Sequence, residues 1–167
     1  NPVLRPLANY FFKRLKKWDV TTINNVDLYI ANSKNVAKRV AQFYNRKAEV
    51  VYPPIESALF KHPLMRSKNK DYYLSFGALT PYKRIDLLVD CFNSNGKKLI
   101  IIGNGSEKEK LQKKAKPNIE FKGFLEDAVL KSYIQNSKAL IFPGEEDFGM
   151  IPLEVMSYGI PVIAFKK

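Results

Sequence analysis

Residues 143–165 read PGEEDFGMIPLEVMSYGIPVIAF, and they predict a loop, a helix and a strand in succession. The helix is expected over about 151–158, where apolar residues follow Gly149, and Gly159 ends it. The apolar run at 161–165 is long enough for a buried strand. This order is typical of domains in which strands alternate with helices.

The same alternation extends back through the chain to residue 72. The expected strands are 72–76, 98–102, 119–121 and 139–142, and the expected helices are 83–92, a charged helix that ends near 116, and 127–135. This pattern predicts an α/β fold, a Rossmann-like parallel sheet with helices on both faces. Right-handed crossovers would place every strand-to-helix loop at one edge, where open sheets of this class bind ligands.

Residues 53–70 contain proline, serine and lysine with weak periodicity, which predicts a linker. We expect residues 1–60 to be the end of a preceding domain or its hinge, 61–70 the linker, and 71–167 an α/β domain that is incomplete at its C-terminus. The chain starts without methionine, so we expect a piece of a longer protein. Segment 6–18 predicts an amphipathic helix whose apolar stripe packs onto a domain, with anionic lipid as the alternative partner. That stripe consists of Leu7, Phe11, Leu15 and Trp18.

The chain is basic: 28 lysines and arginines against 16 acids give 167 residues a net charge of +12. Such a charge favours anionic partners, namely nucleic acid, anionic lipid or phosphorylated small molecules. The single cysteine, Cys91, cannot form an internal disulfide, which favours a reducing compartment. We therefore expect a cytoplasmic protein, with peripheral contact at the cytoplasmic face of a membrane as a further expectation.

The loop before the helix at 151–158 combines features that suit a bound diphosphate or sugar. The first amides of a helix have no partner inside it and carry partial positive charge. Gly149 allows close approach of the backbone, and Glu154 could accept from paired hydroxyls such as those of a ribose. The alternative for Glu146 and Asp147 is a simple electrostatic preference for a helix N-terminus.

Four segments together resemble the retaining GT-B glycosyltransferases of family 4. The stretch 143–165 has the family's E-x7-E spacing, its Phe-Gly before an apolar pair, and its downstream G-x-P-V-I-A. The segment FGALTPYKRIDLLVDCF (76–92) resembles the first phosphate loop of the family. The segments NNVDLYIANSKNVAKRV (24–40) and VVYPPIE (50–56) are similar to its mannosyltransferase branch.

The resemblance implies a role for each matching residue, and residues 71–167 would be the donor-binding domain. Glu154 would bind the ribose of the nucleotide, Glu146 the donor sugar, and Lys83 the diphosphate, so that Glu146 and Lys83 would be the catalytic residues. Backbone groups in the strand-to-helix loops would complete the site. The other implied donor-binding residues are Gly77, Arg84, Gly103, Asn104, Gly105, Gly123, Phe124, Leu125, Asp127, Phe148, Gly149, Met150 and Ile151.

Two positions leave alternatives open. The family often has arginine just after the glycine of the first loop, where this chain has Ala78. Arg84 would supply the second positive charge, or it would instead pair with Asp86 or another acid. Asp127 would accept from a guanine base, or it would cap the helix that begins there.

The resemblance implies transfer of mannose from GDP-mannose to a glycan or lipid-linked acceptor, with retention of configuration. No Asp-x-Asp, cysteine cluster or P-loop is present, and His62 is the only histidine, so we expect no metal and no cofactor beside the donor. The alternatives are a UDP-sugar donor or, in another class, a basic nucleic-acid-binding module. We expect the acceptor site in a missing N-terminal domain, and this chain alone to be inactive.

Overall fold

The computed structural model describes residues 4–55 and 71–165. The described residues fall into two compact units, which belong to the chain segments Asn1–Pro53 and Pro54–Lys167. The predicted linker at 61–70 and His62 lie outside the described residues. The expected division of the chain into segments 1–60, 61–70 and 71–167 stays a prediction.

The first unit is a small βαβ arrangement preceded by a long helix. Strands β1 and β2 pair in parallel on either side of α2 in the sequence. The Ser33 hydroxyl accepts from the amide of Val36 at 3.1 Å and so caps the start of α2. The elements are α1 (Leu4–Thr21), a 3₁₀ turn (Thr22–Asn25), β1 (Tyr29–Ala31), α2 (Lys34–Tyr44) and β2 (Ala48–Val50).

Helix α1 exposes the apolar stripe that the sequence predicts. Leu7, Phe11 and Leu15 are each 55% exposed, Trp18 is 64% exposed, and no residue of α1 is buried. The expected packing of this stripe is therefore not seen in the part of the chain that the structure describes. Helical spacing shows which side of a helix is apolar, but it carries no information on what covers that side.

The second unit has a five-stranded parallel sheet in the order β5-β4-β3-β6-β7, which confirms the predicted α/β architecture. Its strands are β3 (Tyr73–Phe76), β4 (Leu99–Ile102), β5 (Ile119–Gly123), β6 (Leu140–Phe142) and β7 (Val162–Ala164). Its helices are α3 (Ile85–Asn95), α4 (Lys108–Lys114), α5 (Asp127–Gln135) and α6 (Met150–Ser157).

Helix α3 begins later than the sequence suggests. A 3₁₀ turn, Pro81–Lys83, precedes it, and Arg84 adopts a left-handed conformation with φ 55°. The predicted start at residue 83 is therefore wrong by two residues, because this left-handed residue separates the turn from the helix.

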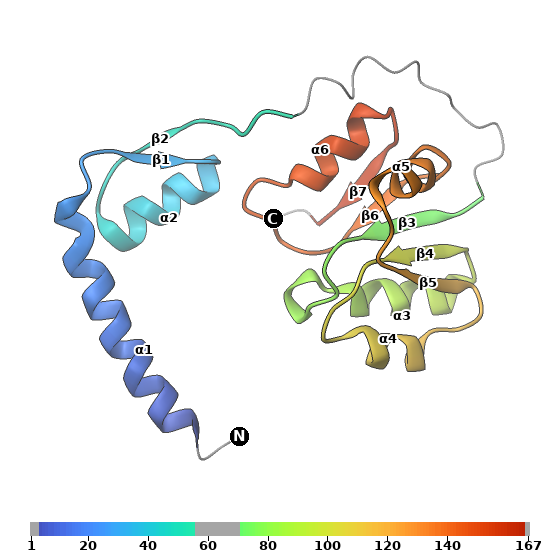
Figure 1. The fold of residues 1–167 in the computed structure, drawn as a ribbon, viewed down its shortest axis with the longest axis horizontal. Coiled ribbons are helices and arrows are strands. Elements are labelled where there is room, and N and C mark those ends of the chain that lie inside the picture. The colour runs from blue at the N-terminus through green and yellow to red at the C-terminus, as the bar shows by residue number, and fades with distance from the viewer. Residues whose placement is uncertain (1–3, 56–70, 166–167) are drawn as a thin grey trace. The chain divides into compact units, whose positions relative to one another are not determined.

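Helices cover both faces of the sheet, α3 and α4 on one side and α5 and α6 on the other (Figure 1). The interior strand β4, which lies between β5 and β3, is apolar throughout because each face buries every second residue. Its Leu99 and Ile101 pack with α3 and α4, whereas Ile100 and Ile102 pack on the side of α5 and α6. Two cores therefore fix the sheet from both sides and hold its loops in place.

Candidate functional site

The carboxyl ends of β3 and β6 lie where the order in which the chain adds strands to the sheet reverses. From β3 the chain adds β4 and β5 on one side, and then places β6 and β7 on the other. The loop after β3 leads to one face and the loop after β6 to the opposite face. Parallel sheets bind ligands beside such diverging loops. The structure thus singles out residues 77–84 and 143–149.

The glycines at the ends of β3 and β4 allow two loops to pack backbone against backbone. A Cβ on Gly103, whose φ is 136°, would lie 1.9 Å from the carbonyl oxygen of Gly77. A Cβ on Gly105 would lie 2.3 Å from the carbonyl oxygen of Leu79. The Gly103 amide in turn donates to the carbonyl of Gly123 at 2.7 Å. The structure brings these predicted loop residues together at one edge.

Lys83 and Glu146 join the loop after β3 to the loop after β6. The Lys83 ammonium donates a hydrogen bond to a carboxylate oxygen of Glu146 and forms an ion pair with it. The two side chains are only 16% and 30% exposed. Burial lowers the pKa of Lys83 from its ordinary value. The two residues that the resemblance singles out for catalysis are therefore in direct contact.

Three neighbours that the sequence did not single out hold Lys83 in this position. A Cβ on Gly144 would lie 3.1 Å from the Cα atom of Lys83, so glycine allows the second loop to pack on the first. The ammonium lies 5.2 Å from the ring centroid of Tyr82 and 5.5 Å from that of Phe142. Both distances fall within the range of cation–π attraction. In the sequence, an aromatic residue at the end of a strand could have indicated a contact with a lysine, but it equally indicates a core residue.

Helix α6 begins directly beside the first loop. Gly149 precedes it with φ 86°, a conformation that favours glycine. A Cβ on Gly77 would lie 3.6 Å from the Ile151 side chain, so the start of α6 faces the end of β3. Pro152 has no amide hydrogen, which leaves Met150 and Ile151 as first-turn amide donors.

Glu154 and Asp127 bring two carboxylates near one another from α6 and α5. Burial raises the pKa of Glu154, and the negative charge of Asp127 raises it further. Asp127 is the first residue of α5 and does not occupy the capping position, which Glu126 holds without a side-chain hydrogen bond. The alternative in which Asp127 caps this helix is therefore wrong, because the helix starts at Asp127 itself.

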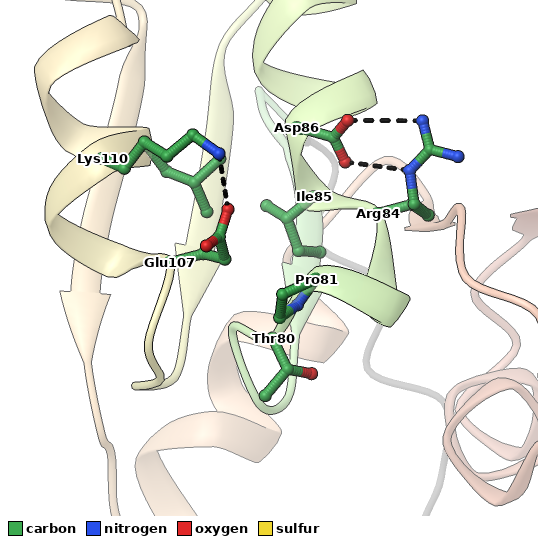
Figure 2. Close-up of a pocket in the computed structure, with 8 residues that line it drawn as sticks. Thr80, Pro81, Arg84, Ile85, Asp86, Glu107 and Lys110 are labelled. Atoms are coloured by element: carbon green, nitrogen blue, oxygen red, sulfur yellow. Dashed lines mark hydrogen bonds and ion pairs between the residues drawn. The ribbon is translucent and has the colours of Figure 1, made fainter. Parts of the chain in front are cut away.

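Arg84 pairs with Asp86, which is one of the two alternatives for this residue. Its Nε and Nη2 atoms donate to the two carboxylate oxygens at 3.1 and 3.3 Å. This hydrogen bond lowers the pKa of Asp86. The pair lies at a pocket of about 170 Å³, which Lys110 and Glu107 also line. Figure 2 shows the Arg84–Asp86 pair on one side of Ile85 and the Lys110–Glu107 pair on the other. The buried Thr80 hydroxyl also lines this pocket, and it has no hydrogen-bond partner among the residues that the structure describes.

The remaining predicted residues lie at the ends of β4 and β5. The Asn104 side chain accepts from the Lys108 ammonium at 2.7 Å, and that ammonium also lies near Gly123. Phe124 is 76% exposed, while Leu125 packs against the core. Lys108 was not among the predicted site residues, because a lysine in a charged helix equally indicates a solvated face. Within the described residues, no group of three or more His, Cys, Asp or Glu could hold a metal ion.

The family model described as "Glycosyl transferases group 1" matches residues 58–167. An uncharacterized glycosyltransferase of Methanocaldococcus jannaschii, MJ1178, is 28% identical over 162 residues, which cover 94% of this chain and 43% of the relative.

Two relatives carry a mannosyltransferase name. The O-antigen chain mannosyltransferase RfbU of Salmonella typhimurium is 25% identical over 169 residues, with 94% of this chain and 46% of the relative covered. A GDP-mannose-dependent alpha-mannosyltransferase of Mycolicibacterium smegmatis is 34% identical over 89 residues, 53% of this chain and 24% of the relative. The chain thus spans less than half the length of the relatives it matches.

Solved structures share the fold at low sequence identity. The Alr3699/HepE protein of Anabaena, solved in complex with UDP and glucose, has a TM-score of 0.76 and 20% identity. The match covers 94% of this chain and 49% of that protein. Among the described helices, none combines the length and apolar character that crossing a membrane requires.

Proposed function

The chain belongs to the glycosyl transferases group 1, and we propose that the edge at the ends of β3 and β6 is the nucleotide-sugar donor site of a retaining mannosyltransferase of family 4. The observation that carries the proposal is the contact between Lys83 and Glu146 at the point where the order of strand addition reverses. A cation and a carboxylate pair there, and α6 begins at the same edge of the sheet. Donor and acceptor groups of this kind suit a diphosphate that is attached to a sugar.

Each group has a distinct part in the proposed transfer. The Lys83 ammonium stabilises the negative charge that develops on the diphosphate as it leaves. The amides of Met150 and Ile151 donate to the diphosphate or to sugar hydroxyls. Glu154 accepts from the ribose hydroxyls and Glu146 from the sugar hydroxyls. We propose that transfer needs no metal, because lysine and helix amides supply the positive charge.

GDP-mannose is the proposed donor. The support comes from two relatives whose names specify mannosyl transfer, one of them GDP-mannose-dependent. Asp127 adds to it, because a carboxylate accepts from both the N1 and amino groups of guanine. A UDP-sugar donor is the second candidate, and the UDP in the Anabaena structure of the same fold favours it.

The proposed acceptor is a glycan or a lipid-linked sugar. Transfer requires donor and acceptor in one closed cleft. The relatives are more than twice the length of the chain. We propose that a further N-terminal domain supplies the acceptor side and that residues 1–167 alone transfer no sugar. The proposed place of action is the cytoplasm, with peripheral contact to the membrane as an additional proposal.

Thermal unfolding in the presence of nucleotides tests this function. A ligand at about 100 times its dissociation constant adds about 2.7 kcal/mol to the free energy of unfolding. GDP should therefore raise the melting temperature more than UDP or ADP at equal concentration. A salt-dependent gain with oligonucleotides, and none with any nucleoside diphosphate, would instead indicate the nucleic-acid-binding alternative.

A further inference from the structure

We propose that Glu146 competes with the donor diphosphate for the Lys83 ammonium, so that a diphosphate binds by displacing the Glu146 carboxylate. The proposal rests on the proposed donor site. It adds a means by which that site distinguishes a nucleotide sugar from the free nucleoside diphosphate that the reaction releases.

The contact between the Lys83 and Glu146 side chains is a partly buried ion pair. Glu146 accepts a hydrogen bond from Lys83 within an ion pair. The two side chains are 16% and 30% exposed, so water screens the pair less than it screens an ion pair at the surface. A diphosphate that takes this ammonium must therefore offset the loss of a partly buried partner.

The contacts around Lys83 restrict where its ammonium can bind a ligand. The Lys83 backbone lies against Gly144, which belongs to the same loop as Glu146. The ammonium lies within cation–π range of the Tyr82 and Phe142 rings. The nearest cation in sequence, Arg84, is held by both oxygens of Asp86. In the proposed exchange, a phosphate oxygen at Lys83 takes the position of the Glu146 oxygen that accepts from the ammonium.

A sugar supplies new hydrogen-bond donors to the displaced Glu146 carboxylate. Hydroxyl groups of a sugar can donate to a carboxylate, whereas a bare diphosphate is largely ionised at neutral pH and acts mainly as an acceptor. A nucleotide sugar therefore compensates Glu146 for the lost ammonium, whereas a nucleoside diphosphate does not. Glu146 should weaken the binding of the released product more than that of the donor, which favours product release.

Calorimetric titration of the 167-residue chain with pyrophosphate, UDP and GDP tests the exchange. Glu146→Gln keeps the shape of the side chain but removes its charge, and it should bind all three ligands roughly two- to tenfold more tightly than wild type. Glu146→Ala should show the same gain without a new amide group. Uridine and guanosine, which carry no phosphate, should bind equally well to all three proteins.

Two further variants separate competition from a general change of charge. Glu145→Gln changes the net charge by the same amount in the same loop, and it should give a clearly smaller gain. Lys83→Met should abolish the gain from Glu146→Gln, because no ammonium remains to be released. An equal gain from Glu145→Gln, or a gain that persists with Lys83→Met, would overturn the exchange.

Different results of the titrations would contradict this inference and the proposed function. If wild type binds a nucleoside diphosphate and Glu146→Gln binds it no more tightly, the exchange is wrong and the donor site stands. If none of the proteins binds pyrophosphate, UDP or GDP, the proposed function fails and the exchange fails with it.

Discussion

The Lys83 ammonium and the Glu146 carboxylate form an ion pair between residues 63 positions apart in the sequence. The pair connects the loop that leaves β3 for one face of the sheet with the loop that leaves β6 for the other. A lysine next to a carboxylate at this point can bind an anion and orient hydroxyl groups at the same edge. The proposed donor site consists of this pair and the start of α6.

Lys83→Ala should weaken GDP binding by about 1.5–3 kcal/mol, as expected for the loss of a charge-assisted hydrogen bond. Guanosine binding should change far less, because guanosine carries no diphosphate. Isothermal titration calorimetry measures both affinities. Lys113→Ala, an exposed change of the same charge on α4, is the control. Equal losses for GDP and guanosine would remove Lys83 from the diphosphate site.

Glu154→Gln should stabilise the fold at neutral pH but weaken nucleotide binding. The folded-state pKa of Glu154 is raised by burial, so the folded protein loses stability as pH rises from the ordinary pKa through the raised one. Replacement of Glu154 by glutamine removes this loss of stability. The gain in the free energy of unfolding should be no more than about 1 kcal/mol, because solvent screens the partly exposed side chain.

Urea unfolding of wild type and Glu154→Gln at pH 4 and pH 7 measures the effect. The stability difference should be larger at pH 7, and Glu109→Gln, an exposed change of the same charge on α4, is the control. A Glu154→Gln variant that gains stability only at pH 4 would contradict the stated cause of the shift.

Gly103→Ala should destabilise the second unit by about 3 kcal/mol or more. Its Cβ would lie 1.9 Å from the Gly77 carbonyl oxygen, and its φ of 136° disfavours any side chain. Gly96→Ala is the matched control, because φ there is 67° and, among the described residues beyond its chain neighbours, none comes within 4 Å of the added Cβ. That change should cost only about 1–2 kcal/mol. Equal midpoints in urea unfolding would show that the two loops do not pack as described.

Arg84→Ala separates the two alternatives for Arg84. Because Asp86 holds the guanidinium in a bidentate pair that is about half exposed, we expect the ratio of GDP to guanosine affinity to stay within about twofold. The free energy of unfolding should fall by less than about 1 kcal/mol. A tenfold drop in that ratio, measured by calorimetry, would instead support Arg84 as the charge that compensates for Ala78.

Much of the sheet could be predicted because its signals are local. Strands β3, β4 and β6 are short, mostly apolar runs that are directly followed by glycine or proline, and α5 occupies the predicted residues 127–135. Gly77, Gly103 and Gly123 mark the ends of three adjacent strands, and the structure brings them to one edge. The predicted fold class is confirmed for this reason.

The contacts that define the candidate site could not be predicted, because they join distant segments. Nothing in the sequence near Lys83 indicates that its partner is Glu146 or that the Phe142 ring lies beside its ammonium. The left-handed residue Arg84 also escaped prediction, because arginine rarely adopts that conformation. The exposed face of α1 shows the same limit, since periodicity does not specify what covers an apolar stripe.

Binding of intact nucleotide sugars tests the central claim, a donor site at the ends of β3 and β6, most directly. GDP-mannose, UDP-glucose and ADP-glucose should be titrated calorimetrically into the wild-type chain and into Glu154→Ala. We predict that GDP-mannose binds wild type most tightly and loses about 2–3 kcal/mol in Glu154→Ala. Wild type that binds none of the three, or Glu154→Ala that binds GDP-mannose as tightly as wild type, would contradict the proposed donor site.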